Sequence, residues 1–309
     1  MKTALLFPGQ GAQAVGMGRD LAVARPACRA LFDRANAVLG YDLATLCFEG
    51  PLETLTQSCH AQPAIFVVSL ACLTAWRESR PAAACAAAAG LSSGEWTALH
   101  AAGVISFEDT LRVLDIRGRA MQAACEAHPG AMLSVLGMAD DALARLARET
   151  GVEIANLNSP EQTVLSGPRA GIDAAEQRAR EFGAKKAIRL PVAGAFHSVL
   201  MTSAACQLAE GLAGVQLSPP QYPVISNVTG QFHTTPEEIR QLMVRQITSS
   251  VQWVWGIRTL QAQGVQAYVE CGPGKVLTGL VKRIDKQAAL YNIADHSSAG
   301  TVAAPAETG

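Results

Sequence analysis

The chain has 309 residues, enough to bury a large core in one domain, or in one domain that carries a smaller insertion. Lys and Arg number 25 against 26 Asp and Glu, so the net charge creates no field that would attract nucleic acid or an anionic membrane. The eight cysteines are scattered and form no Cys-x-x-Cys metal or redox pair, which favours a reduced, cytoplasmic setting. The first apolar stretch is too short for a signal peptide, and the alanine-rich run 82–89 is well short of the ~20 residues of a membrane-spanning helix.

The first elements in chain order are typical of an α/β sheet. Residues 3–7 form a short apolar run that ends in the loop Pro-Gly-Gln-Gly at 8–11, which predicts a buried strand delivered into a tight turn. Apolar residues then recur at helical spacing over 16–39 and 62–77, with Gly or Pro at the limits. These two segments are predicted to be helices that cover the sheet.

The next segment predicts a strand, a sharp turn and a helix. Residues 84–89 are small enough for a strand that is covered on both faces. Gly-Leu-Ser-Ser-Gly follows at 90–94, and a helical pattern then runs through Ala102.

Between about residues 127 and 195 the pattern changes to β-α-β-β-α-β. This order is the split βαβ arrangement, which forms its own small sheet with two helices on one face. The predicted elements are the strands 131–136, 152–157, 163–166 and 186–190 and the helices 140–150 and 169–182.

After this insertion the pattern returns to the first style. Helices are predicted over 236–248 and 253–263, followed by a strand over 267–271 and a Gly-Pro-Gly turn before a last helix. The small, polar residues from 296 onward predict a disordered tail. The predicted division is therefore a large domain of residues 1–126 and 196–295, an insert of 127–195 and a tail of 296–309.

The segment 90–94 matches the G-x-S-x-G nucleophile elbow, in which a strained strand-to-helix turn exposes a serine hydroxyl. The register selects Ser92, because Ser93 has no glycine two positions before it. An oxyanion that forms beside Ser92 would meet backbone N–H groups at the start of the following helix, that of Ser93 first. The alternative is a glycine-rich surface turn, since such pentapeptides also arise by chance.

A serine nucleophile needs a base at neutral pH, and histidine is the usual one. Of the six histidines, His197 is the leading candidate because it lies in a short loop just after the insert. His100 would lie two turns along the elbow helix, facing away from the cleft. The others are in polar, loop-like stretches: His60, His128, His233 and His296. A purely structural or surface histidine remains the alternative for His197.

Arg117 lies in a helical stretch and could hold a carboxylate through two parallel hydrogen bonds, which lysine cannot reproduce. An ordinary solvated arginine paired with Asp or Glu is the other interpretation. Gln10 is likewise open to an interpretation as a turn residue that caps its loop. Neither a metal nor a nucleotide motif occurs, so no tightly held cofactor and no metal is expected.

Together, seven segments in this order resemble the malonyl-CoA:acyl carrier protein transacylase family, the free-standing acyltransferases of fatty-acid and polyketide synthesis, over nearly the whole chain. They are residues 7–13, 90–95, 117–122, 156–160, 196–198, 251–253 and 270–277. The resemblance implies an α/β-hydrolase-like large domain with an inserted ferredoxin-like subdomain and an active site between them. It also implies transfer of malonyl from malonyl-CoA to an acyl carrier protein, with the acyl group held on a serine in between.

The same resemblance implies the roles of individual residues. Ser92 would be the nucleophile, His197 the general base, Arg117 the clamp for the malonyl carboxylate, and the N–H groups of Gln10 and Ser93 the oxyanion hole. Gln246 would help to orient His197. The sequence Ala195-Phe196-His197 resembles the malonyl-selective loop of the family. Leu91 and Ser93 depart from the family's commonest pattern without affecting these roles.

Two other functions remain open at this point: a serine hydrolase that clears stalled acyl groups from carrier proteins, and a catalytically silent docking partner of a synthase. An acidic carrier protein would need a local basic patch, for which scattered surface charge is the alternative. The candidates are Lys185, Lys186, Arg189, Lys275, Lys282 and Arg283.

Overall fold

The computed structural model describes residues 1–81 and 84–301; residues 82–83, inside the alanine-rich run, and 302–309, in the expected tail, lie outside the described residues. One of its two four-stranded sheets is parallel, with the strand order β2-β1-β7-β8. The strands are β1 (Lys2–Phe7), β2 (Ala87–Gly90), β7 (Val265–Cys271) and β8 (Ala289–Ile293). Helices cover both faces of this sheet, and its central strand β1 is accordingly buried from its second residue onward.

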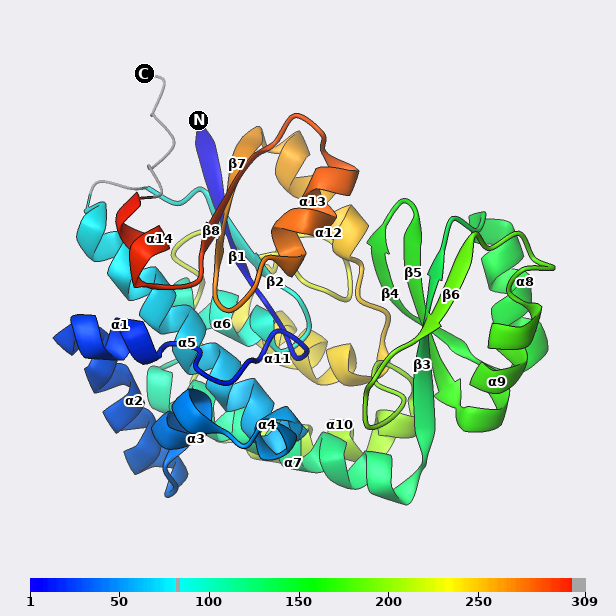
Figure 1. Cartoon of the computed structure of the whole chain (residues 1–309), viewed down its shortest axis with the longest axis horizontal. Coiled ribbons are helices and arrows are strands. Elements are labelled where there is room, and N and C mark those ends of the chain that lie inside the picture. Colours follow the sequence, from blue (N-terminus) through cyan, green and yellow to red (C-terminus); the bar gives the residue numbers. More distant parts are fainter. Residues whose placement is uncertain (82–83, 302–309) are drawn as a thin grey trace.

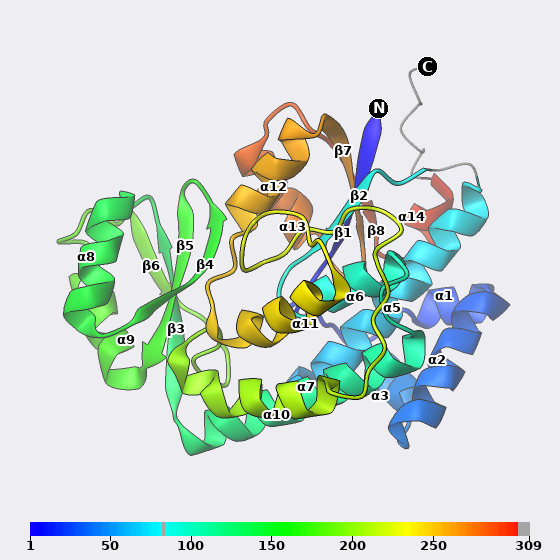
Figure 2. The same ribbon diagram turned by 180° about the vertical axis from the view of Figure 1, so that it is seen from behind.

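Helices surround this sheet on both sides, and most of them carry one buried face (Figures 1 and 2). Those before the small sheet are α1 (Arg19–Ala24), α2 (Pro26–Leu39), α3 (Leu43–Glu49), α4 (Leu52–Thr56), α5 (Ser58–Ser79), α6 (Gly94–Ala101) and α7 (Phe107–Ala127). Those after it are η1 (Val199–Met201), α10 (Thr202–Leu212), α11 (Pro236–Arg245), η2 (Gln246–Thr248), α12 (Trp253–Ala262), α13 (Val276–Ile284) and α14 (His296–Thr301).

Helix α5 is the one helix in the described part of the chain that is long and apolar enough to cross a membrane. However, 83% of its apolar window is buried inside the protein. It packs between the sheet and helices α2 and α7, so its apolar surface is already covered. We therefore interpret α5 as a core helix.

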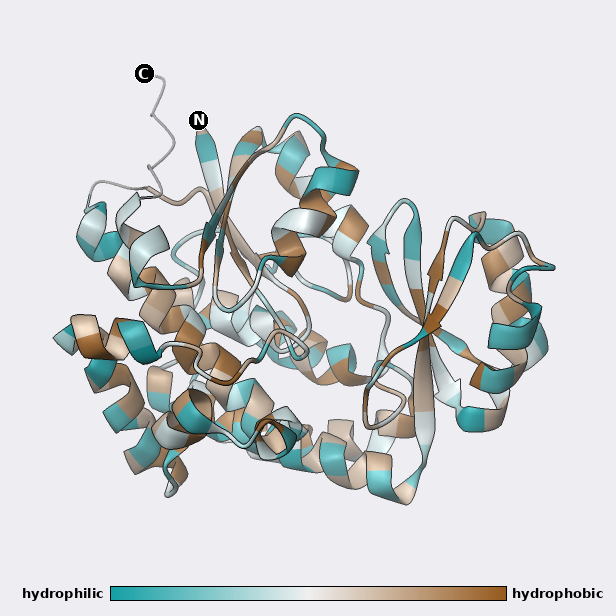
Figure 3. Cartoon of the chain, viewed as in Figure 1, coloured by the Kyte–Doolittle hydropathy of each residue, from teal (hydrophilic) through white to brown (hydrophobic). Residues whose placement is uncertain are grey.

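The second sheet is the predicted small one, and it projects to one side of the molecule (Figure 1). Its order β4-β5-β3-β6 is antiparallel and is that of the split βαβ arrangement, which confirms the predicted fold class. Its elements are β3 (Gly130–Leu136), α8 (Asp140–Thr150), β4 (Glu153–Ser159), β5 (Gln162–Pro168), α9 (Arg169–Arg178) and β6 (Lys186–Arg189). Hydrophilic and hydrophobic colours alternate along α8 and α9, as expected for helices with one face on a sheet (Figure 3). The domain boundaries at 127 and 195 stay a prediction.

Backbone hydrogen bonds fasten the small sheet to the segment before α12. The Leu157 N–H donates to the Val251 carbonyl at 2.9 Å, and the Val251 N–H donates to the Ala155 carbonyl at 2.8 Å. Val251, which belongs to the larger part of the chain, therefore pairs with Asn156 of strand β4 in an isolated β-bridge. These two hydrogen bonds hold the small sheet in place on one side of the space between the two sheets.

The C-terminal part of the chain differs from the sequence expectations. Strand β8 was not predicted, and the tail prediction was wrong for residues 296–301, which form α14. Asp295 accepts a hydrogen bond from the Ser298 N–H at 2.7 Å, and the His296 N–H donates to Asp20 at 2.7 Å. Ala299 is buried. Capping and packing therefore override the polar composition of this segment.

Candidate active site

The nucleophile elbow forms as predicted, between β2 and α6. Ser92 has a φ of 55°, in the left-handed region that a residue with a side chain rarely adopts. The flanking glycines allow the backbone to pass very close to itself. A Cβ on Gly90 would lie 1.9 Å from the Gly94 carbonyl oxygen, and one on Gly94 would lie 2.2 Å from that of Phe7. Only glycine fits at either position, so the turn that exposes Ser92 requires both of these glycines.

His197 and Ser92 are in hydrogen-bonding contact although they are far apart in the chain. The Nε2 atom of His197 lies 2.9 Å from the Ser92 Oγ, and its Nδ1 lies 2.9 Å from the backbone carbonyl oxygen of Gln246. A carbonyl can only accept, so Nδ1 carries the proton of the neutral ring and Nε2 is free to accept one from the serine. This is the geometry of a serine with its base.

The environment of His197 keeps its ring neutral. The side chain is buried, with the residue 4% exposed. Burial lowers its pKa to about 4, and the positive charge of Arg117 acts in the same direction. The Gln246 carbonyl opposes this shift but does not reverse it. At neutral pH His197 is therefore a proton acceptor.

Arg117 reaches the same serine from helix α7 and is 1% exposed. Its Nη2 donates to the Ser92 Oγ at 3.1 Å and to the Gln246 Oε1 at 2.9 Å, and its Nη1 donates to the Gln62 Oε1 at 2.7 Å. Burial lowers the pKa of Arg117 to about 10, and the charge of Glu95 opposes that shift. Its Nε has no partner in the described part of the chain, so a buried donor remains for a ligand.

Gln10 and Ser93 lie on the two loops that meet at the elbow. Within residues 1–81 and 84–301, neither backbone N–H donates to another protein group. The side chain of Gln10 is fixed, since its Nε2 donates to the Ser58 Oγ at 3.1 Å and its Oε1 accepts from Gln62 at 3.4 Å. Two unused N–H groups, that of Ser93 at the start of helix α6 and that of Gln10 in the loop after β1, suit a developing negative charge.

These groups line a cleft of about 470 Å³ between the two sheets. Phe196 contributes to its wall, as do Met121 of α7, Met132 of β3, Val164 of β5 and Leu280 of α13. The wall is mostly apolar, with a few convergent polar groups at Ser92, which is typical of a small-molecule site. Within the described residues, no cluster of three or more His, Cys, Asp or Glu could hold a metal ion.

Of the predicted site residues, Ser92, His197, Arg117 and Gln246 are in direct contact, and Gln10, Ser93 and Phe196 line or flank the same cleft. Gln246 contacts His197 through its backbone carbonyl, whereas its side chain binds Arg117. Among the basic candidates, Arg189 is already paired with Asp173 and Glu176. Lys275 and Lys282 are exposed.

Four polar residues of this site were not identified from the sequence: Gln62, Glu95, Asn227 and His233. Gln62 had a recognisable signal, because it is a polar residue next to the apolar run 63–68 of its helix. Glu95 directly follows the elbow pentapeptide. The positions of Asn227 and His233 had no local signal, and His233 was placed in a polar loop although its side chain is buried.

Comparisons with known proteins agree with this site. A model of the acyl transferase domain family matches residues 4–304. The malonyl CoA-acyl carrier protein transacylase of Bacillus subtilis is 42% identical over 299 residues, which cover 95% of this chain and 94% of the relative. The structure of an acyl carrier protein S-malonyltransferase from Vibrio cholerae has a TM-score of 0.93 and 40% identity, and covers 96% of this chain and 98% of that one. A malonyl-transacylase solved in complex with its type II PKS acyl-carrier protein has a TM-score of 0.92 and 37% identity, and covers 97% and 98%. The chain belongs to the malonyl CoA-acyl carrier protein transacylase family of acyl transferases.

Proposed function

We propose that this acyltransferase moves a malonyl group from malonyl-CoA to the phosphopantetheine thiol of an acyl carrier protein. The observation that carries this is the guanidinium of Arg117 beside the Ser92 Oγ, at 3.1 Å, on the floor of an apolar cleft. A buried arginine without a carboxylate ligand is an unfavourable arrangement, which an acyl group ending in a carboxylate relieves.

In the first half-reaction, Nε2 of His197 takes the proton from the Ser92 Oγ as this oxygen attacks the thioester carbonyl. The N–H groups of Gln10 and Ser93 donate to the oxyanion of the tetrahedral intermediate. The C–S bond then breaks, the protonated His197 returns its proton to the leaving sulfur, and coenzyme A departs. A malonyl ester of Ser92 remains.

In the second half-reaction, the thiol of the carrier protein gives its proton to His197 and attacks the ester. The serine oxygen leaves and recovers that proton, so the enzyme returns to its starting state. Two half-reactions at one serine predict ping-pong kinetics. Parallel lines are therefore expected in initial-rate plots with both substrates varied, and intersecting lines would contradict the scheme.

The reaction as written uses coenzyme A only as the carrier of the substrate and needs no tightly held cofactor. We place the enzyme in the cytoplasm, in fatty-acid or polyketide synthesis; the scattered free cysteines support a reducing compartment. The exposed Lys275 and Lys282 are candidates for contact with an acidic carrier protein.

The first test is the intact mass of wild type and Ser92→Ala after brief exposure to malonyl-CoA, with acetyl-CoA as the control donor. A malonyl-sized adduct on wild type alone is expected. No adduct with either donor would favour a silent docking partner, and turnover of the thioester in water without any acceptor would favour a hydrolase. An acetyl adduct as strong as the malonyl adduct would remove the role given to Arg117.

A further inference from the structure

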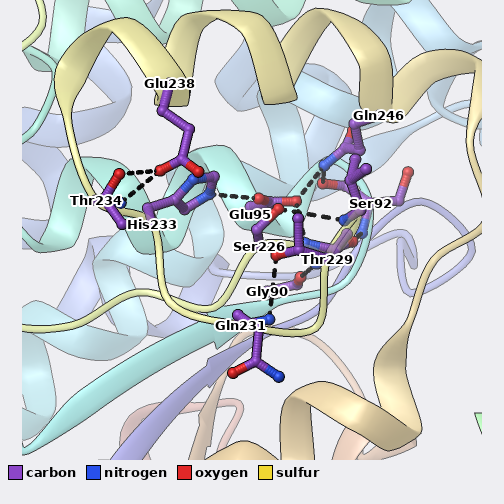
Figure 4. Close-up of polar contacts among 12 residues, drawn as sticks. Gly90, Ser92, Glu95, Ser226, Thr229, Gln231, His233, Thr234, Glu238 and Gln246 are labelled. Atoms are coloured by element: carbon purple, nitrogen blue, oxygen red, sulfur yellow. Dashed lines mark hydrogen bonds and ion pairs between the residues drawn. The ribbon is translucent and has the colours of Figure 1, made fainter.

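Glu95 is a fully buried carboxylate directly behind the nucleophile, in the first turn of α6. Its Oε1 accepts from the His233 Nε2 at 2.7 Å. Its Oε2 accepts from the Gln246 Nε2 at 2.6 Å and from the Asn227 N–H at 3.1 Å. Figure 4 shows Glu95 between His233 and Gln246, with Ser92 close to Gln246. The reaction scheme above uses neither Glu95 nor His233.

Glu95 sets the direction of the Gln246 amide. The Nε2 of Gln246 donates to Glu95 and to the Ser92 carbonyl oxygen, at 2.6 and 3.0 Å, and both of these groups can only accept. The amide oxygen must therefore point the other way, where it accepts from the Arg117 Nη2 at 2.9 Å. Since the backbone carbonyl of Gln246 holds the His197 ring, a single residue orients both the base and the arginine.

Glu95 also fixes Asn227, which holds the strained turn. The Ser92 N–H donates to the Asn227 Oδ1 at 2.7 Å, and the Asn227 Nδ2 donates to the Gly90 carbonyl at 2.7 Å. A left-handed φ of 55° at a serine persists only where the surroundings over-determine it. The side chains of Asn227 and Gln246 thus hold the N–H and the carbonyl of Ser92. Each of these two residues also donates a hydrogen bond to Glu95.

His233 and Gln246 lie at the two ends of helix α11, and Glu95 binds both. The side chain of His233 is 0% exposed, and its backbone N–H donates to the Val224 carbonyl at 2.9 Å. The next residue, Thr234, is tied to Glu238 of α11 through its N–H at 2.9 Å (Figure 4). The carboxylate therefore ties the segments just before and just after α11 to the elbow helix.

We propose that Glu95 and His233 are positioning residues of this site: His233 holds the Glu95 carboxylate, which through Gln246 and Asn227 sets the positions of His197, Arg117 and Ser92. This inference rests on the proposed function for its reaction but not for its geometry. Neither residue touches the substrate, so their loss should lower the rate of the chemical step more than it weakens binding.

The test compares His233→Leu, which removes the donor to Glu95, with His233→Gln, which keeps an N–H at that end of the side chain. His100→Leu is the matched control, because His100 lies at the other end of α6 and its side chain hydrogen-bonds the Ile105 carbonyl, at 2.9 Å, and no other group of the described residues. Two rates are measured: malonylation of Ser92 over a range of malonyl-CoA concentrations, and labelling of Ser92 by a fluorophosphonate probe.

We expect His233→Leu to lower the maximal malonylation rate and the labelling rate by about tenfold to a hundredfold, with the half-saturating malonyl-CoA concentration changed less than about threefold. His233→Gln should recover most of both rates, and His100→Leu should keep them. Glu95→Gln keeps one acceptor oxygen for Gln246 and Asn227, and its amide can donate to His233 once that ring carries its proton on Nδ1, so this variant should lie between the two His233 variants.

A folded His233→Leu protein with wild-type rates would overturn the inference, as would equal losses in His233→Leu and His100→Leu at matched melting temperatures. Should His233→Leu not fold, a His233→Gln protein with no recovery of the labelling rate in the folded state would overturn it equally. If wild type reacts with the fluorophosphonate but not with malonyl-CoA, the proposed function fails while the positioning role is still measured by the probe.

Discussion

The depressed pKa of His197 predicts that serine acylation persists in acid where an ordinary histidine base would fail. The ordinary pKa is 6.5, and burial with the charge of Arg117 lowers that of His197 to about 4. At pH 5.5 a histidine of ordinary pKa would be about 90% protonated, whereas one of pKa 4 would be about 3% protonated. The malonylation rate at pH 5.5 should therefore stay near its plateau, instead of falling about tenfold.

The assay is single-turnover malonylation of Ser92 from pH 3.5 to 8, quenched and read by intact mass, with the folded state checked by circular dichroism at each pH. The acid limb should be centred near pH 4 to 5. An acid limb centred near 6.5 in a protein that is still folded would refute the argument that burial and Arg117 keep His197 neutral. Arg117→Gln, followed by fluorophosphonate labelling, should move this limb to higher pH, because one of the two causes that lower the pKa of His197 is then gone.

Three further predictions concern selectivity and stability. Arg117→Ala should lower kcat/KM for malonyl-CoA by about 30-fold to several thousand-fold and raise the relative rate with acetyl-CoA. Substitution of the exposed Arg119 on the same helix by Ala should change neither quantity. An unchanged donor preference in Arg117→Ala would contradict the role of Arg117 as the carboxylate clamp. In denaturant titrations, wild type should lose up to about 3 kcal/mol of unfolding free energy relative to His197→Gln as the pH falls from above 6.5 to about 4. The reason is that His197 takes up its proton at a higher pH in the unfolded chain than in the folded one. Equal changes of the unfolding free energy with pH in the two proteins would contradict the depressed pKa of His197. Gly94→Ala should lower the unfolding free energy by about 3 kcal/mol, because its Cβ would lie 2.2 Å from a backbone oxygen. Gly279→Ala, whose Cβ would have nothing within 4 Å, should raise the unfolding free energy by about 0.5–1 kcal/mol. Similar effects at both sites would refute the packing argument.

The sequence predicted those parts of the fold that local patterns determine. The elbow at Ser92 was identifiable because glycine is the one residue that fits at positions 90 and 94. The β-α-β-β-α-β order of the small sheet followed from apolar periodicity, and helix α8 has the predicted bounds, Asp140–Thr150. The helix predicted over 16–39 is broken at Arg25, before Pro26, into α1 and α2.

What the sequence did not yield depends on contacts between distant segments. Asn227 binds Ser92 across 135 positions and Glu95 binds His233 across 138, and neither Asn227 nor His233 lies in a motif that the chemistry alone would select. Both histidines of this site are single residues in irregular segments, and their side chains are bound by residues far away in the chain. The short tail helix α14 was missed in part for a similar reason, because its contact with Asp20 spans 276 positions of the chain.

Ser92 and His197 are the non-glycine residues with a positive φ in the described part of the chain, at 55° and 57°. The residue that would suit either backbone best is glycine, which has neither hydroxyl nor imidazole. Stability and turnover therefore pull in opposite directions at these two positions. A library of this enzyme selected only for resistance to heat would be expected to accumulate inactive proteins, so thermostable variants should be screened by acyl transfer and not by melting temperature.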